Sequence, residues 1–498
     1  MTGLPTAKEF RQTVRCRIVR SHPDPPNQKR RSTSMPHQLQ RRQLLQAGLT
    51  GFTGLTLPGL YRARAEAATS RQSDTAIILV WLRGGQSHLD TFDMKPDAVS
   101  DYRGPFSPID SNVPGMSITE LYPKMSQCAD RFALLRSVAH NAGGHPAGSL
   151  RVLGGDPASA DKPTPTYPDW MSIASYLRHD PSRQLPNYVT VNPVDRYDSF
   201  QIAGPAYLGP SYEPFKVTGD PSAPKFSVPN LGLSDQEANR RLGERSDLRR
   251  NIDLMRRDID QTGLMRAFDS FDAQALRLLS SPEAAKAFDV SQEPDKLRDR
   301  YGRNSWGQQC LMARRLVEAG VDIVSTEFDG PLCGRVANWD DHAVNHHVFD
   351  ANKHRAPFYD QAISALIEDI YDRGLDRRVM VVVTGEFGRT PRITNVASSG
   401  GGVASAAKGT VQPGRDHWPR ANTMLFSGGG IQTGQVIGAT DKNGEDPISR
   451  RVTPYDFLMT IFQHLGFDHV QLALHSFAGR RNPIFSKGDP IPELARTS

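Results

Sequence analysis

Thr75-Ala76-Ile77-Ile78-Leu79-Val80-Trp81-Leu82 is a continuous apolar, β-branched run of strand length that stops at Arg83-Gly84-Gly85. An uninterrupted run of this kind predicts a strand that is covered on both faces. Residues 321–326 and 378–384 have the same character, and the second run again stops at a glycine, Gly385. A shorter apolar run at 423–426 precedes a glycine cluster. These four runs predict the strands of one buried sheet.

Helical patterns stand directly before two of these strands. Residues 308–319 repeat apolar side chains at helical spacing and stop at Gly320, and residues 359–373 do the same and stop at Gly374. A helix followed by a buried strand, repeated, predicts an α/β fold: a doubly wound, mostly parallel sheet with helices on both faces. In such sheets ligands bind beyond the carboxyl ends of the strands.

The composition and the hydrophobic pattern of the sequence change between about residues 160 and 300. Residues 163–229 are rich in proline, glycine and tyrosine, and residues 234–287 form a charged segment with helical spacing. We expect this part to be an inserted cap within one domain that runs from 68 to 498.

Residues 35–67 have the order of an exported leader. Arg41-Arg42 precede a weakly apolar stretch, and Ala63-Arg64-Ala65 supplies a small-residue cleavage signal. The arginine pair favours a twin-arginine signal peptide, although a basic amphipathic surface helix is the alternative. Met35 then serves as an alternative start, and residues 1–34 are expected to be a disordered extension. We therefore expect export to the periplasm or cell surface, with the twin-arginine translocase as a partner.

This leader also accounts for the basic composition. The chain carries a formal charge of +6, residues 1–34 carry +6 and residues 35–67 carry +3, so residues 68–498 carry −3. The basicity is therefore not that of a nucleic-acid-binding surface, and no nucleic-acid partner is expected. No later segment has about 18 uninterrupted apolar residues, so no stable membrane span is expected.

Acidic and imidazole side chains gather in the loops that follow these strands and in nearby glycine turns. They are His88, Asp90, His140, His145, Asp340, His342, His346, Glu386 and His417. Imidazole with carboxylate is the usual ligand set for zinc, manganese or iron. Several of these groups also have a structural interpretation: Asp340-Asp341-His342 can cap a helix, Glu386 can pair with Arg389 or Arg392, and His145 can be a loop histidine.

Five stretches together resemble a known family: residues 80–93, 313–321, 339–342, 384–391 and 414–419. They are similar to DUF1501, a family of exported bacterial proteins that is a remote member of the alkaline phosphatase–sulfatase superfamily. The resemblance implies an alkaline phosphatase-type sheet around a divalent metal, namely zinc, manganese or calcium. The metal ligands that it implies are Asp90, with His88 or Asp93 beside it, and Asp340, His342, Glu386 and His417.

The sequence departs from the superfamily pattern at one expected metal ligand and at the nucleophile motif. Phe387 stands where a ligand histidine is expected, so His346 or His145 would have to supply that ligand. His145 also stands at the nucleophile position, and the arginine of the sulfatase motif is missing, so sulfatase chemistry through a formylglycine is not expected.

The leading functional hypothesis is an exported metal-dependent hydrolase of phosphate or sulfate esters, on a small-molecule or polysaccharide substrate. A metal-bound water or His145 would attack, and Arg389 or Arg83 would neutralise the developing charge. The alternatives are a non-catalytic exported binding protein that keeps the fold, and a redox metalloenzyme with iron or copper.

The arginine pair is directly testable. We predict that the double substitution Arg41→Lys and Arg42→Lys strongly reduces export, because the twin-arginine route reads this pair. Cell fractionation and immunoblotting measure the exported share, with a Lys29→Arg chain as the control. Normal export of the double variant would contradict the signal-peptide assignment.

Overall fold

The computed structural model describes residues 74–180, 182–228, 281–330, 338–401, 404–467, 473–475, 481–483 and 487–497, with single positions 231, 278 and 332. The predicted extension 1–34, with the alternative start Met35, and the leader 35–67 lie outside the described residues. Most of the charged segment 234–287 does so too.

One eight-stranded sheet organises the domain, in the order β16-β4-β15-β10-β1-β9-β5-β8. Its strands are β1 (Ala76–Leu82), β4 (Phe132–Val138), β5 (Tyr188–Val191), β8 (Phe215–Val217), β9 (Ile323–Phe328), β10 (Val379–Thr384), β15 (Asn422–Gly428) and β16 (Gln435–Ile437). Within it, β15 runs antiparallel to both neighbours, and every other neighbouring pair is parallel. The prediction of a mostly parallel sheet is confirmed.

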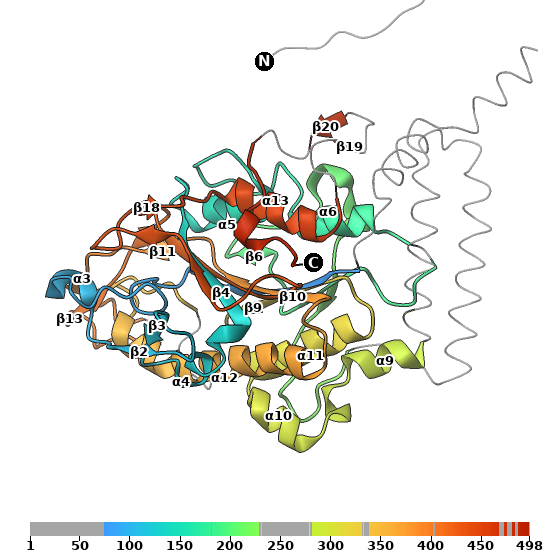
Figure 1. The fold of residues 1–498 in the computed structure, drawn as a ribbon, viewed down its shortest axis with the longest axis horizontal. Helices are drawn as coiled ribbons and strands as arrows, with labels where there is room; N and C mark the ends of the chain where they lie inside the picture. The colour runs from blue at the N-terminus through green and yellow to red at the C-terminus, as the bar shows by residue number, and fades with distance from the viewer. Residues whose placement is uncertain are drawn as a thin grey trace, which may run out of the picture. The chain divides into compact units, whose positions relative to one another are not determined.

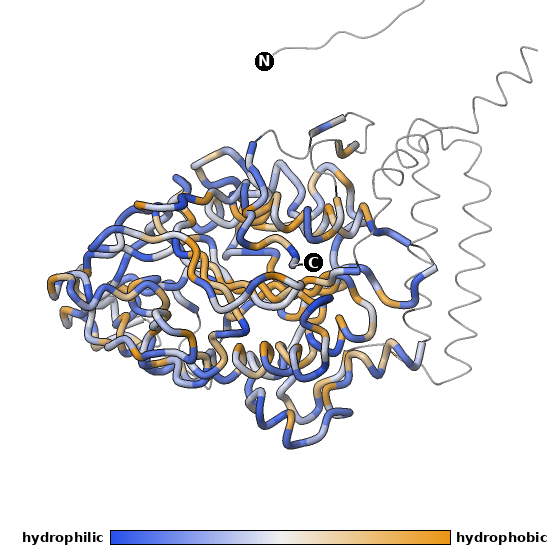
Figure 2. Tube along the Cα trace, viewed as in Figure 1, coloured by the Kyte–Doolittle hydropathy of each residue, from blue (hydrophilic) through white to orange (hydrophobic). Residues whose placement is uncertain are grey.

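The central strand β1 explains why the sequence is apolar at every position. Ile78 and Val80 pack into the core cluster that includes α11 and α12, whereas Ile77 and Leu79 pack into the cluster of α5, α6 and α13. Because successive side chains point to opposite faces, helices on both sides bury both sets. Figure 1 shows these two helical layers, and Figure 2 shows the hydrophobic residues along the strands between them.

The helices of the two layers have well-defined bounds. They are α5 (His145–Gly154), α6 (Trp170–Leu177) and α13 (Pro454–His464) on one face, and α9 (Pro282–Phe288), α10 (Asp295–Tyr301), α11 (Ser305–Glu318) and α12 (Val348–Asp372) in the other group. Among the helices of the described residues, none combines the length and apolar character that a membrane crossing requires.

The prediction of a helix at 359–373 covers only the second half of α12. The helix begins at Val348, with the Nδ1 atom of His347 accepting a hydrogen bond from the Asp350 amide, and it continues through Pro357. Proline lacks an amide hydrogen and disfavours helix interiors, which is why the sequence pattern hides the first half.

Some described residues of the segment 160–300 lie in the main fold. Here α6 packs in the core of one face, and β5 and β8 are strands of the main sheet, with β5 parallel to β9. These described residues therefore belong to the α/β domain. Both strands are short and lie among turn residues, so their periodicity is too brief to be seen in the sequence.

Short elements form the loops around the sheet. They are α3 (Ser100–Arg103), α4 (Pro123–Ser126) and the paired strands β2 (Pro108–Asp110) with β3 (Ser117–Thr119), β6 (Arg196–Tyr197) with β7 (Phe200–Gln201), β11 (Gly388–Arg389) with β14 (His417–Trp418), β12 (Thr394–Ala397) with β13 (Val411–Gly414), β17 (Ala439–Thr440) with β18 (Pro447–Ser449), and β19 (Ala473–His475) with β20 (Arg481–Pro483).

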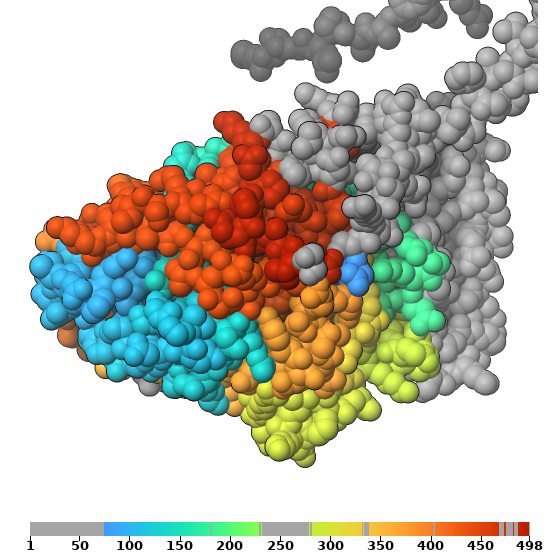
Figure 3. Space-filling model, viewed as in Figure 1, coloured from blue at the N-terminus to red at the C-terminus, as the bar shows by residue number. Residues whose placement is uncertain are grey.

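The loops after β1, β4, β9 and β10 meet at one edge of the sheet, because these strands all run in the same direction. The antiparallel strand β15 begins at this edge, so the residues before it, including β14, lie there as well. The segment after β1 also reaches the C-terminal part, where Thr440 donates a hydrogen bond to Asp93 and Tyr102 donates one to Glu445 at 3.2 Å. Figure 3 shows this blue segment against the orange-red one.

The burial of β1 predicts a graded loss of stability. Ile78 is fully buried, so Ile78→Ala should lower the free energy of unfolding by about 2–5 kcal/mol, and the control Ile78→Val by about 0.5–1.5 kcal/mol. Guanidinium denaturation followed by circular dichroism measures both. A cost below about 0.5 kcal/mol for Ile78→Ala would contradict a strand packed on both faces.

Candidate metal centre

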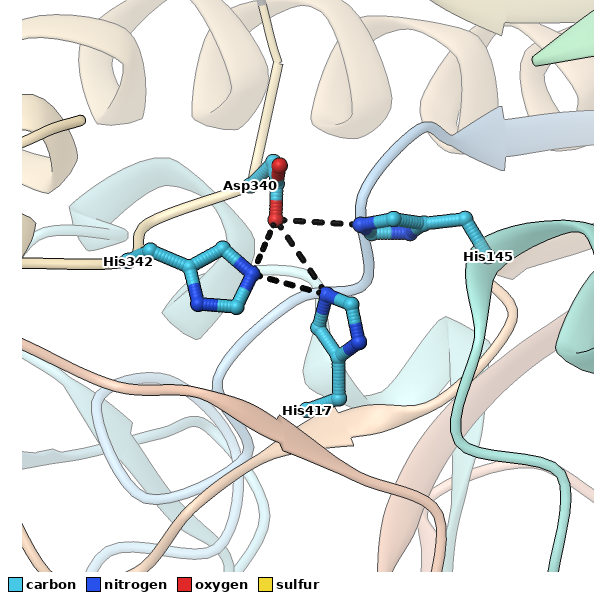
Figure 4. Close-up of side chains that lie close together, drawn as sticks. All are labelled: His145, Asp340, His342 and His417. Carbon is cyan, nitrogen blue, oxygen red and sulfur yellow. Dashed lines mark hydrogen bonds and ion pairs between the residues drawn. The ribbon is translucent and has the colours of Figure 1, made fainter. Parts of the chain in front are cut away.

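Four side chains converge at the carboxyl edge of the sheet: His145, Asp340, His342 and His417 (Figure 4). His145 is the first residue of α5, Asp340 and His342 lie in the loop between β9 and α12, and His417 lies in β14. One potential ligand atom from each lies within 4.8 Å of all the others. The sequence separates these residues by up to 272 positions, so only the fold brings them together.

Asp340 stands at the middle of this cluster. Its Oδ1 atom lies 3.1 Å from Nε2 of His145, 3.0 Å from Nε2 of His342 and 3.4 Å from Nε2 of His417. The Nε2 atoms of His342 and His417 are 2.8 Å apart. Three ring nitrogens of the same kind therefore face one carboxylate oxygen.

The opposite nitrogen of each ring already has an acceptor. Nδ1 of His145 lies 2.6 Å from Oε1 of Glu386, Nδ1 of His342 lies 2.6 Å from Oδ1 of Asp416, and Nδ1 of His417 lies 2.7 Å from the Gly143 carbonyl oxygen. Neutral rings that donate from Nδ1 direct their Nε2 lone pairs at the cluster centre. This is the arrangement that fixes metal-ligating histidines in proteins, so the donor set can hold a cation.

Burial and hydrogen bonds shift the pKa values of the cluster in opposite directions. Burial lowers the pKa of His145, but hydrogen bonds with Asp340 and Glu386 outweigh it and raise this pKa. The pKa of His342 is also raised. Burial lowers it, but the hydrogen bond with Asp340 and the charge of Asp340 outweigh the burial. For His417 burial prevails, and its pKa is lowered. The Asp340 carboxyl, despite its burial, has a pKa far below the ordinary value because three histidines bond to it.

Local backbone features place His145 at the start of α5. Pro146 occupies the first turn, where its missing amide hydrogen costs nothing. The Ala147 amide donates to Oδ1 of Asp161 at 2.9 Å, which satisfies one of the free amides at this helix end. A Cβ at Gly144 would lie 2.2 Å from the same carboxylate, so a larger residue here would displace the Asp161 side chain.

Arg389 fixes Asp340 from the other side. Its Nη2 atom donates to Oδ1 of Asp340 at 2.9 Å and also to the carbonyl of Gly84, and its Nε donates to the carbonyl of Gly85 at 3.1 Å. The side chain is fully buried, and Nη1 donates to the Arg415 carbonyl at 3.2 Å. Each guanidinium nitrogen of Arg389 therefore already has an acceptor. Arg389, which was predicted to be catalytic, holds the Asp340 carboxylate in position.

The structure places Asp90 and His88 outside this cluster. The buried Asp90 carboxylate pairs with Arg415, with Oδ2 at 2.8 Å from Nε and Oδ1 at 3.1 Å from Nη2. Nε2 of His88 lies 2.8 Å from the Gly444 carbonyl. Asp93 accepts from Lys95 at 3.0 Å and from Thr440. The three implied ligands after β1 therefore have partners elsewhere.

The other residues expected at the metal site lie partly inside and partly outside the cluster. Glu386 lies behind His145, with Oε1 also accepting from the Gly84 amide at 3.0 Å, and is not one of the four clustered groups. His346 lies 3.4 Å from Asp341 instead. Of the two residues considered as the replacement ligand, His145 is the one in the cluster. Phe387 contributes an apolar wall, with its ring centroid 4.5 Å from that of His417.

Two residues around the cluster were given no role by the sequence reasoning. Asp416 precedes His417 within the quoted motif, so that adjacency could have identified it. Tyr197, whose ring stacks on His145, comes from the proline- and glycine-rich segment, and no pattern in the sequence marks it.

A family model matches most of the chain. The chain belongs to the DUF1501 family, described as proteins of unknown function, whose model matches residues 74–495. The family resemblance inferred from the five stretches is therefore confirmed. Among curated proteins, none matches the chain.

Among solved structures, the chain is similar at low identity to several enzymes. TAB5 alkaline phosphatase with bound magnesium has 10% identity and a TM-score of 0.36, with 80% of this chain and 99% of that chain covered. Phosphonate monoester hydrolase from Silicibacter pomeroyi has 12% identity and a TM-score of 0.31, covering 80% and 74%. A sulfatase from Pseudoalteromonas sp. has 12% identity and a TM-score of 0.28, covering 83% and 71%.

The glycine pair after β1 generates a prediction about the cluster. Gly84 has φ +96°, and a Cβ there would lie 2.5 Å from the Asp340 amide nitrogen. Gly320 has φ +103° with nothing within 4 Å. We predict that the strained backbone conformation lowers the free energy of unfolding of both alanine variants by about 1–2 kcal/mol. The decrease should be larger for Gly84→Ala, because the new Cβ displaces Asp340.

Thermal unfolding of Gly84→Ala and Gly320→Ala measures this difference. A clearly larger decrease in Tm for Gly84→Ala is expected. Equal decreases would mean that the Gly84 contact does not hold the Asp340 loop.

Proposed function

We propose that this protein is an exported metal-dependent hydrolase of phosphate or sulfate esters, acting on a small-molecule or polysaccharide substrate. The observation that carries the proposal is the convergence of three imidazole Nε2 atoms on one carboxylate oxygen at the carboxyl edge of the sheet. Export rests on the leader pattern of residues 35–67, and the hydrolase chemistry rests on this cluster.

The donor set favours zinc or manganese as the resident ion. Three imidazole nitrogens and one carboxylate oxygen suit these metals, whereas calcium prefers a shell of oxygens. When bound, such an ion polarises an ester oxygen and lowers the pKa of a coordinated water. Its ligands in this proposal are His145, Asp340, His342 and His417, so His145 is assigned to metal binding instead of nucleophilic attack.

The surrounding residues hold these ligands in one arrangement. Glu386 and Asp416 accept hydrogen bonds from His145 and His342, which fixes the ring planes and the tautomers. Arg389 keeps Oδ1 of Asp340 in place through a charged hydrogen bond. The N-terminus of α5 also lies here and contributes the positive end of a helix dipole, which favours an anionic substrate group.

A non-catalytic binding protein is the second candidate, and one observation favours it. The four clustered groups are three imidazoles and one carboxylate, all assigned here to metal binding, and the guanidinium of Arg389 already has its acceptors. A protein that keeps the metal but lacks a protein nucleophile would bind an anionic group without turnover unless water attacks. Turnover therefore separates the two candidates.

Metal content and hydrolysis test the proposal together. We predict about one equivalent of zinc or manganese in the purified wild-type protein. The Asp340→Ala protein should lose most of it, because this substitution removes the carboxylate at the centre of the cluster. Elemental analysis by mass spectrometry measures the metal, and release of 4-nitrophenol from aryl phosphate and sulfate esters measures turnover.

His354→Ala is the matched control, because this histidine lies outside the cluster and contacts the Leu332 carbonyl at 3.3 Å. It should keep both metal and activity. Metal content that does not change in Asp340→Ala would contradict the site. Full metal content without any ester hydrolysis would reject the hydrolase and favour the binding protein.

A further inference from the structure

Tyr197 lies directly on the candidate metal centre. Its ring stacks on that of His145, with centroids 4.1 Å apart and planes 8° from parallel. The guanidinium carbon of Arg83 lies 4.1 Å from the centroid of the same tyrosine ring. Both groups cannot occupy one face of the ring at this distance, so Tyr197 is held between His145 and Arg83.

Arg83 also fixes the backbone that carries Tyr197. Its Nη1 donates to the Arg196 carbonyl at 2.9 Å, and its Nη2 donates to Oδ1 of Asp198 at 3.1 Å. The β6–β7 turn is thus fastened to the loop that follows β1. Asp198 in this turn has φ 52°, an uncommon conformation for a residue other than glycine. The contacts with Arg83 hold the turn in this conformation and keep Tyr197 over the cluster.

The hydroxyl of Tyr197 has no hydrogen-bond partner within the described part of the chain. Its oxygen is also not one of the fully buried side-chain atoms that lack a hydrogen-bond partner. A tyrosine hydroxyl, with an ordinary pKa of about 10, is protonated at neutral pH and can donate a hydrogen bond.

The histidine Nδ1 atoms and the Arg389 guanidinium, the other donors described at this cluster, are already engaged. The Nδ1 atoms of the three histidines have acceptors at 2.6–2.7 Å, and Arg389 is fully buried with its own acceptors. An anion that entered the centre would therefore find the Tyr197 hydroxyl as a side-chain donor with no competing partner.

We propose that Tyr197 is a substrate-contacting residue of this centre, whose hydroxyl donates a hydrogen bond to an oxygen of the phosphate or sulfate group. This inference rests on the proposed function and adds a specificity-determining residue to it. The stacked ring sets the position of the donor, and the donor requires an oxygen acceptor next to the metal ligands.

Tyr197→Phe tests the donor while keeping the ring between His145 and Arg83. The probes are inorganic phosphate and inorganic sulfate, titrated by calorimetry into the zinc-loaded or manganese-loaded protein. Loss of a hydrogen bond to a charged group should weaken the binding of the anion by about 10-fold or more. Metal content should not change, because the substitution leaves the ring stack on His145 in place.

Tyr207→Phe is the matched control, since this tyrosine lies in the same region and the charges of the cluster do not act on it. It should bind both metal and anion as the wild type does. Equal anion affinity of Tyr197→Phe and wild type would overturn the role of Tyr197 alone. If the metal-loaded wild type binds neither anion, the proposed function fails, and the inference fails with it.

Discussion

The site depends on one carboxylate oxygen, Oδ1 of Asp340. Three imidazole nitrogens approach it at 3.0–3.4 Å and the guanidinium of Arg389 donates to it at 2.9 Å. A half-buried carboxylate with this many polar neighbours is favourable only if each neighbour is itself fixed and hydrogen-bonded. The acceptors behind the three rings, and the loop carbonyls that bind Arg389, meet this requirement. Asp340 therefore ties together loops that come from distant parts of the chain.

The sheet provides the framework on which these loops meet. Parallel strands end at the same edge, so β1, β4, β9 and β10 deliver Gly84, His145, Asp340 and Glu386 to one region. Two buried ion pairs then restrain the loops. Arg355 donates to Oδ1 of Asp341 at 2.9 Å, next to Asp340, and Arg415 binds Asp90 near His417. Breaking either pair would leave a buried charge without a partner, so the edge of the sheet is held in one arrangement.

The sequence indicated the fold well because buried strands have an unmistakable composition. Residues 75–82, 321–326, 378–384 and 423–426 all correspond to strands of the sheet, and their order gave the mostly parallel topology. Asp340, His342 and His417 could be named as candidates because acids and imidazoles follow strands or glycine turns there. The direction of a side chain within its loop is not encoded locally. Asp90 and His88 looked equivalent to them, yet Arg415, 325 residues away, takes the Asp90 carboxylate. Tyr197 could not be identified for the same reason, since it lies between β5 and β8 in the chain and contacts His145 only through the tertiary fold.

The central claim is that His145, Asp340, His342 and His417 bind one metal ion together. The most direct measurement is a crystal structure of the zinc-loaded protein with anomalous data collected at the zinc absorption edge. We predict one strong anomalous peak about 2.0–2.2 Å from the three Nε2 atoms and the Asp340 carboxylate. A peak next to Asp90 and His88, or no peak within the four-residue cluster, would contradict it.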